Sequence, residues 1–325
     1  MKKIIILLVL LLSAIPCRAQ VEDSAYLFSY FIDNGQDGLH LAWSEDGLLW
    51  KALNNNQSFL KPEAGKDKLM RDPCIIQTPD RVFHMVWTVS WGEKGIGYAH
   101  STDLVHWSEQ RYLPVMEHEE KAKNCWAPEI FFDTSRKEFI LFWSTTIPGR
   151  FPETDGSGDR NNNHRMYYVS SRDMEQFSET RLLYDPGFNS IDGTLLKHGD
   201  RYLMFLKDET RYPEAKKNIR VAAAAFPTGP WSPASEPIYD KEWAEGPTIA
   251  LVGHRWILYF DRYQAKSFGA MASTNLEQWE DISDQLSFPE GIRHGTILRV
   301  SKATIEGLSE GKVGSGTKNE LVHSL

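Results

Sequence analysis

Ser101-Thr-Asp-Leu-Val-His-Trp107 shows a pattern that recurs along the chain, beginning at residues 44, 101, 171, 225 and 273. The pattern is a serine, any residue, an aspartate or asparagine, three residues and an aromatic residue. Ser, Asp and Asn side chains bond to the backbone of tight turns, and the aromatic ring anchors the following strand. The fourth copy, Ala225-Phe-Pro-Thr-Gly-Pro-Trp231, has lost the serine and the aspartate. The irregular spacing is near that of propeller blades, so these turns predict a repeat architecture.

Each turn belongs to a larger repeat. Short apolar segments rich in aromatic residues and bounded by polar residues precede the turns, which favours strands over helices. These segments are 26–31, 82–87, 139–143, 202–206 and 256–260. Another element lies upstream of four of them: Asp72-Pro-Cys-Ile-Ile76, Ala127-Pro-Glu-Ile-Phe131, Asp192-Gly-Thr-Leu-Leu196 and Glu245-Gly-Pro-Thr-Ile249.

The two ends of the repeat complement each other. His294-Gly-Thr-Ile-Leu298 resembles the upstream elements but has no turn after it, and the turn at Ser44 has no such element before it. We therefore predict an all-β, five-bladed propeller in which the C-terminal strand completes the blade that residues 26–53 begin. Such closure removes exposed strand edges.

The first nineteen residues have the composition of a secretory signal peptide. Lys2 and Lys3 precede the apolar run 4–12, and Cys17-Arg-Ala19 supplies a small-residue cleavage site. We expect cleavage after Ala19 and a secreted or periplasmic protein. Cys17 as a lipoprotein cysteine is the alternative, which Ile15-Pro16 fits poorly. No later stretch is long and apolar enough to span a bilayer.

Without the leader, 306 of the 325 residues remain, and loss of its three positive side chains changes the formal net charge from −8 to −11. This charge argues against nucleic acid or an anionic membrane as partner and is compatible with an oligo- or polysaccharide. No linker interrupts the repeats, so we expect one domain over 20–304 and a C-terminal tail over 305–325. We expect a monomer.

Two features have alternative interpretations. Asp155-Gly-Ser-Gly-Asp159 is similar to the start of a calcium loop, but Arg160 replaces the required glycine, so we interpret 147–164 as a polar loop at the rim. Cys74 and Cys125 head neighbouring inner strands. A disulfide between them would contribute about 4 kcal/mol, but two unbridged buried thiols are the interpretation that we favour.

The residues that head the inner strands carry the chemistry. Aligned on the following Gly or Pro, they are Asp72, Ala127, Asp192, Glu245 and His294. Inner strands of a propeller converge on its channel, where neighbouring like charges raise each other's pKa. One acid before Gly or Pro is ordinary turn chemistry, whereas three acids in register indicate a functional site.

Such a trio suits glycoside hydrolysis. One carboxylic acid protonates the leaving oxygen, one carboxylate activates water or attacks directly, and a neighbouring charge adjusts the pKa of the acid. Trp126, Trp87 and Trp91 could stack on a sugar ring, and Trp126 is the strongest candidate because it precedes Ala127.

Together these motifs resemble glycoside hydrolase family 43, a family of five-bladed propellers that includes α-L-arabinofuranosidases, β-xylosidases, arabinanases and galactosidases. The resemblance extends from about residue 26 to residue 300. Its motifs are Arg71-Asp-Pro73, Trp126-Ala-Pro-Glu129, Ile191-Asp-Gly193, Glu245-Gly-Pro247 and His294-Gly-Thr296.

The resemblance implies an inverting enzyme with Asp72 as general base, Asp192 as the residue that adjusts the pKa and orientation of the acid, and Glu245 as general acid. It implies no required cofactor, but in some members a calcium ion lies in the channel beside the residue equivalent to His294. We expect the substrate-binding residues to be Trp126, Arg71, Asn124 and His294. Unlike many members, this chain has nearly a blade before its catalytic Asp-Pro.

We predict a secreted exo-acting hydrolase that releases α-L-arabinofuranosyl or related pentosyl residues from plant-type polysaccharide. A β-xylosidase or exo-β-galactosidase of the same family is an alternative. A non-catalytic glycan-binding propeller would be expected to lack one of the acids. A sialidase-like retaining enzyme is disfavoured, because its turns carry a glycine that most of these lack.

Overall fold

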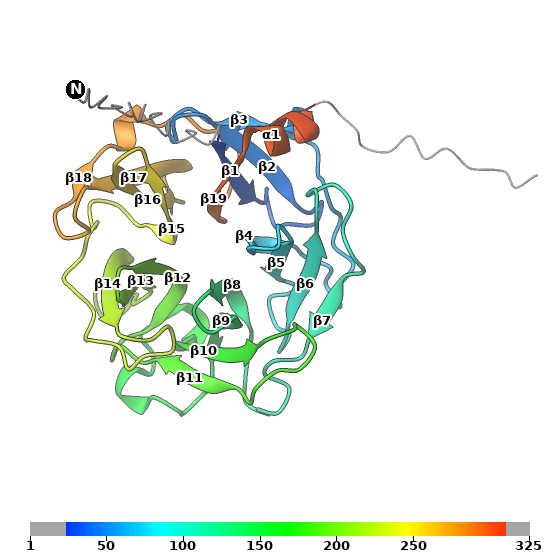
Figure 1. Cartoon of the computed structure of the whole chain (residues 1–325). Helices are drawn as coiled ribbons and strands as arrows, with labels where there is room; N and C mark the ends of the chain where they lie inside the picture. Colours follow the sequence, from blue (N-terminus) through cyan, green and yellow to red (C-terminus); the bar gives the residue numbers. More distant parts are fainter. Residues whose placement is uncertain (1–23, 310–325) are drawn as a thin grey trace, which may run out of the picture.

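Five antiparallel sheets surround one axis in the computed structural model of this chain, which describes residues 24–309 (Figure 1). The predicted five-bladed propeller is confirmed. The expected signal peptide and most of the expected C-terminal tail lie outside the described residues.

Each sheet is one blade, with its first strand nearest the channel. Blade I contains β4 (Arg71–Gln77), β5 (Phe83–Thr88), β6 (Ile96–Ser101) and β7 (Arg111–Leu113). Blade II contains β8 (Trp126–Asp133), β9 (Glu138–Thr146), β10 (His164–Ser171) and β11 (Arg181–Tyr184). Blade III contains β12 (Ser190–His198), β13 (Arg201–Asp208) and β14 (Asn218–Ala224). Blade IV contains β15 (Glu245–Val252), β16 (Arg255–Arg262), β17 (Ser267–Ser273) and β18 (Glu280–Asp281).

Blade V joins the two ends of the described chain. It contains β19 (Ile297–Ser301), β1 (Ser24–Tyr30), β2 (His40–Ser44) and β3 (Lys51–Ala52). β19 pairs antiparallel with β1 from Ser24 opposite Ser301 to Phe28 opposite Ile297. The predicted closure is therefore confirmed, and it leaves neither strand with an unpaired inner edge.

One helix, α1 (Lys302–Ser309), follows β19 directly. Ile305 and Leu308 are buried in the apolar cluster that also contains Leu27 of β1. The boundary that we expected at residue 304 therefore falls inside this helix, because its apolar face packs on blade V. Short 3-10 turns lie at η1 (Asn54–Asn56), η2 (Pro152–Thr154), η3 (Asp159–Asn161) and η4 (Ser283–Gln285). No helix within residues 24–309 has the length and apolarity needed to cross a membrane.

The recurring turn owes its shape to two side chains. Ser101 Oγ accepts from the backbone N–H of Leu104 at 2.8 Å, and Asp103 Oδ1 accepts from that of His106 at 2.7 Å. The residue after the acid adopts a positive φ whether or not it is glycine, as at Gly47 (72°) and Leu104 (66°). The degraded copy lacks these acceptors but still forms an isolated bridge between Ala224 and Trp231, like that between Ser101 and Trp107 in an intact copy. Blade III has three strands.

Apolar side chains fill the spaces between neighbouring blades. Trp87, which we considered as a sugar-stacking residue, is fully buried in this core, so that interpretation is wrong. Cys74 and Cys125 are buried, free thiols in a single cluster, which agrees with the unbridged alternative.

Candidate active site

A β-bulge interrupts the inner strand of blades I to IV at the same place. On β4 the ladder pairs Arg71 with Thr88 and next pairs Cys74 with Val86, so one extra residue lies on β4. The residue after the first pair is left-handed in all four blades: Asp72 (φ 52°), Ala127 (46°), Asp192 (55°) and Gly246 (55°). Non-glycine residues held in this region cost of order 1–3 kcal/mol each, so the fold retains aspartate here despite the cost.

The bulges correct our alignment of the acids. Gly246, not Glu245, is equivalent to Asp72 and Asp192, because the pair before the bulge in blade IV is Glu245 with Asp261. A Cβ atom at Gly246 would lie 2.2 Å from the His294 ring, so only glycine fits at this position. Glu245 instead occupies the place of Arg71, Trp126 and Ile191, one residue nearer the rim.

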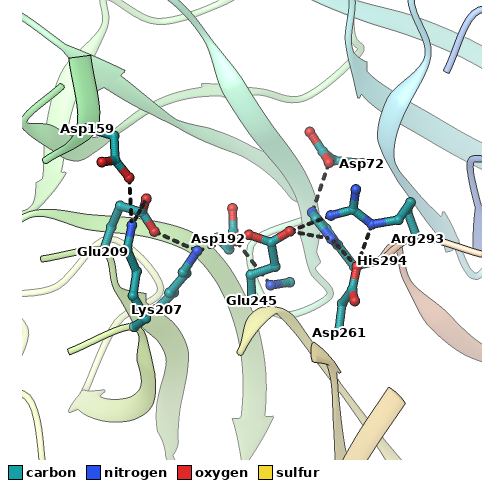
Figure 2. Close-up of polar contacts among 11 residues, drawn as sticks. Asp72, Asp159, Asp192, Lys207, Glu209, Glu245, Asp261, Arg293 and His294 are labelled. Atoms are coloured by element: carbon teal, nitrogen blue, oxygen red, sulfur yellow. Dashed lines mark hydrogen bonds and ion pairs between the residues drawn. The ribbon is translucent and has the colours of Figure 1, made fainter. Parts of the chain in front are cut away.

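His294 joins the acids across the axis (Figure 2). Its Nε2 lies 2.9 Å from Asp72 Oδ1, and its Nδ1 lies 3.3 Å from Asp261 Oδ2 and 3.6 Å from Glu245 Oε1. Burial lowers the pKa of His294, but its bonds to Asp261 and Asp72 outweigh this and raise the pKa to about 10. The ring is therefore an imidazolium at neutral pH and donates from both nitrogens.

Asp72 has the environment of a permanently ionised carboxylate. Burial raises its pKa, but the bond and charge of His294 and the charge of Arg71 hold the pKa well below its usual range. Thr88 Oγ1 donates to Asp72 Oδ2 at 2.8 Å. Asp72 can therefore accept a proton from a water molecule at any ordinary pH.

Glu245 lies between two cations. Lys207 Nζ is 2.9 Å from Glu245 Oε2, and Arg293 Nη2 is 2.6 Å from Glu245 Oε1. Burial raises the pKa of Glu245, but the charges of Lys207, His294 and Arg293 outweigh it and lower the pKa below its usual range.

Asp192 shows the opposite shift. Burial raises the pKa of its carboxyl and outweighs the opposing charges of His294 and Lys207, and the charges of Glu245 and Asp72 add to the rise, so the pKa increases to about 6. Its Oδ2 accepts from the Gly246 N–H at 3.0 Å. Of the two neighbouring acids, Asp192 therefore takes a proton more readily than Glu245.

A row of ion pairs with alternating charge extends from Lys207 away from Glu245 (Figure 2). Lys207 also pairs with Glu209, Glu209 pairs with the buried Lys217, and Lys217 lies 3.7 Å from Asp159 in the 147–164 loop. This row of ion pairs fixes the position of Lys207 and ties the rim loop to the site.

The residues around His294 do not fit the calcium ion that the family resemblance implies. Glu245, Asp261 and His294 form the one group within residues 24–309 whose ligand atoms cluster closely enough for a metal. The guanidinium of Arg293 already bonds to Asp261 at 2.8 Å and to Glu245 at 2.6 Å. Calcium needs six to eight oxygen ligands, whereas the third member here is a protonated imidazole.

Three of the four predicted substrate-binding residues line the cavity that contains the acids, and Asn124 does not. Arg71 lies between the Phe31 and Trp91 rings, 4.7 and 4.4 Å from their centroids, and faces the same cavity as Trp126. Asn34 Oδ1 accepts from both Arg71 Nη1 and Trp91 Nε1. Asn124 does not line this cavity, because it is buried and bonds to the backbone of Ser144 and Thr146.

The acids share a cavity of about 260 Å³, lined by Arg71, Asp72, Thr88, Trp91, Trp126, Ala127, Ile191, Asp192, Lys207, Glu209, Glu245, Arg293 and His294. A larger groove of about 660 Å³ lies between β7 and the turn at 175–180. Its two carboxylates, Glu175 and Glu179, are exposed. That groove therefore lacks a buried pair of acids.

Sequence analysis missed Lys207, Asp261 and Arg293. Lys207 and Asp261 pair with the residue before the bulge, as Thr88 does in blade I and Ser144 in blade II. A polar residue near the C-terminal end of an otherwise apolar second strand is the sequence signal that would have identified Lys207 and Asp261. Arg293 precedes His294 as Arg71 precedes Asp72, a repeat visible in the sequence.

The buried carboxylates therefore gather at one end of the channel of a five-bladed propeller. A family model described as a probable glycosyl hydrolase domain related to glycoside hydrolase family 43 matches residues 22–306, and the chain belongs to this family.

One curated relative is an α-L-arabinofuranosidase of Bifidobacterium longum subsp. longum, 24% identical over 247 residues. The match covers 66% of this chain but only 23% of that protein. The chain therefore corresponds to about a quarter of its relative.

Solved structures share the fold. A thermostable family-43 glycoside hydrolase superposes with a TM-score of 0.52 at 18% identity, covering 72% of this chain and 80% of that one. The α-L-arabinofuranosidase of Lactobacillus brevis gives 0.50 at 17% identity, covering 66% and 72%. An exo-β-1,3-galactanase of Phanerochaete chrysosporium gives 0.51 at 12% identity, covering 68% and 52%.

Proposed function

We propose that this chain is an exported, exo-acting, inverting hydrolase that releases α-L-arabinofuranosyl or related pentosyl residues from plant-type polysaccharide. The observation that carries the proposal is the placement of Asp72 and Glu245 on opposite sides of the His294 ring, both lining one cavity of about 260 Å³. A cavity of this size suits a single terminal sugar better than a long glycan segment.

The two acids take different roles because their partners differ. Asp72 is held ionised by His294 and Arg71 and acts as general base, removing a proton from the attacking water. Glu245 acts as general acid towards the glycosidic oxygen. An inverting mechanism requires the two carboxyl groups to lie about 6.5–9.5 Å apart, with room for the water.

Glu245 has to gain a proton for this role. In the free enzyme its partners Lys207 and Arg293 favour the carboxylate, and the neighbouring Asp192 takes a proton more readily. Neighbouring acids share protons as a pair. We infer that the reactive form is the singly protonated pair with its proton on Glu245, while Asp192 remains charged and orients it.

Two measurements test the proposal. The purified protein is offered aryl arabinofuranosides, xylosides and galactosides, and we expect turnover of the α-L-arabinofuranoside to exceed the others. NMR then follows the anomeric configuration of the first-formed sugar, which we expect to be inverted. Retention would refute the assigned mechanism, and binding of arabino-oligosaccharides without hydrolysis would support a glycan-binding propeller instead. Export is tested by sequencing the N-terminus of protein recovered outside the cytoplasm, expected to begin at Gln20.

A further inference from the structure

A ring of five side chains surrounds the channel one layer below the catalytic residues. Four of them, Cys74, Glu129, Thr194 and Thr248, directly follow the bulges of blades I to IV. The fifth, Thr296, comes two residues after His294, as Cys74 does after Asp72. All five line one cavity of about 330 Å³ in the channel.

Glu129 is the ring's one carboxyl group, and no cation pairs with it. Thr194 Oγ1 donates to Glu129 Oε2 at 3.0 Å, and Thr296 Oγ1 lies 3.5 Å from Oε1. No ion pair to Glu129 occurs within residues 24–309. Glu209 in contrast has two cationic partners and Glu245 has three. Glu129 is half-buried in the channel, and a carboxyl group that is partly removed from water and has no positive partner is disfavoured in its charged form.

A small cavity connects Glu129 with the catalytic layer. Its volume is about 20 Å³, and its walls include Asp72, Glu129, Asp192, His294 and Thr296. A cavity above about 10–15 Å³ can hold one water when two to four polar partners surround it. Asp192 uses its Oδ2 for the Gly246 N–H, which leaves its other oxygen available to such a water.

We propose that Glu129 is a positioning residue of this site: it keeps its proton and, through one water in the 20 Å³ cavity, donates a hydrogen bond towards Asp192. This rests on the proposed function. The bond steadies the charged form of Asp192, which in turn orients Glu245. When Glu129 ionises it becomes an acceptor, and a second negative charge then faces Asp192.

The surroundings of Glu129 agree with a proton that is held at neutral pH. Burial raises its pKa, the bonds from Thr194, Cys74 and Thr296 lower it, and the charge of Asp192 raises it, with a resulting pKa of about 8. The titratable or charged groups that share its two cavities are Cys74 and Asp72 on β4, Asp192 on β12, His294, and Arg299 on β19. Cys74 stays neutral because burial raises its pKa well above the usual value.

Two variants with side chains of similar length test separately the hydrogen-bond donor and the ionisable charge at position 129. Glu129→Gln keeps an N–H donor and cannot ionise, whereas Glu129→Met offers no donor. On a phenyl glycoside, whose poor leaving group needs the acid, we expect Glu129→Gln to stay within about threefold of wild-type kcat at pH 6–7. We expect Glu129→Met to lose about 10- to 100-fold in kcat, as loss of one bond to a charged group gives.

The pH profile supplies the readout that a purely structural role would not move. Wild-type kcat on this substrate should fall above a pH of about 8, and Glu129→Gln should lack that fall. Thr194→Val removes a donor to the carboxylate, so the fall should move to higher pH. Superimposable profiles for wild type and Glu129→Gln, or full activity in Glu129→Met, would overturn the proposal.

A second measurement is independent of activity, and therefore of the proposed function. The infrared difference between wild type and Glu129→Gln should show the carbonyl band of a protonated carboxylic acid at pH 7 that disappears by pH 10. Asp192, whose pKa is raised to about 6, contributes equally to both proteins and cancels in this difference. If no substrate is turned over but this band appears, the proposed function fails while the protonation of Glu129 stands. The absence of the band from this difference would overturn the inference even in an active enzyme.

Discussion

His294 Nε2 lies 2.9 Å from Oδ1 of Asp72. This contact joins the segment just before β19, the strand that closes the ring, to β4 of the neighbouring blade I. The same ring faces Asp261 through Nδ1 at 3.3 Å. Because both partners are carboxylates, the contact keeps His294 charged and Asp72 ionised together. A single residue thus connects ring closure with the chemistry of the proposed base.

The charge of His294 predicts a specific dependence of stability on pH. The folded state holds the proton to about pH 10, whereas the reference pKa is 6.5. The stabilisation is therefore complete below pH 6.5 and is lost as pH rises through about 10, at up to about 1.4 kcal/mol per pH unit. Urea unfolding between pH 6 and 10 should show a smaller loss for His294→Gln than for wild type. The exposed His254→Gln is the control, and equal slopes in wild type and His294→Gln would contradict the assignment.

Leaving-group dependence should separate the acid from the base. A good leaving group departs without a proton, so Glu245→Ala should lose most activity on natural glycans but retain far more on dinitrophenyl glycosides. Asp72→Ala should fail on both, because the water needs its base whichever group leaves. Steady-state kinetics on both substrates provide the measurement. If Asp72→Ala spared the activated substrate and Glu245→Ala did not, the roles would be reversed.

Asp192 should affect the rate far more than the fold. In Asp192→Asn the amide oxygen can still accept from Gly246 N–H, so we expect the melting temperature to change by only a few degrees. Loss of its charge should lower kcat about 100-fold or more, within the range of general acid–base effects. Asp200→Asn, exposed on the hairpin after β12, is the matched control. Near-wild-type turnover in Asp192→Asn would remove it from the proposed trio.

Closure of the ring by β19 should be essential for folding. Deleting residues 292–300 removes the strand that pairs with β1 and should abolish cooperative unfolding. A milder change, Ile297→Ala, truncates a buried side chain and should cost about 2–5 kcal/mol. Arg299→Lys, on the exposed side of the same strand, should cost little. A soluble, cooperatively melting deletion would contradict the role of this segment.

Local signals made much of the architecture predictable. The Ser-x-Asp turn forms its own hydrogen bonds, as at Ser101 and Asp103, so its recurrence marks the repeat in any sequence. Unmatched elements at Ser44 and His294 were enough to predict closure. The boundary at residue 304 was less predictable, because the docking of Ile305 and Leu308 depends on the surface that blade V presents.

The sequence by itself determined the blades, the closure and the acids Asp72, Asp192 and Glu245, because repeats and their turn residues are local in the chain. Only the tertiary structure decided that Glu245 stands one residue off the register of the other acids. It also decided that Lys207 and Arg293 hold Glu245 from two sides, and that Glu129 lies uncompensated beneath Asp192. The physical reason is that inner strands far apart in sequence converge at one axis, where burial and the neighbouring charges set each pKa.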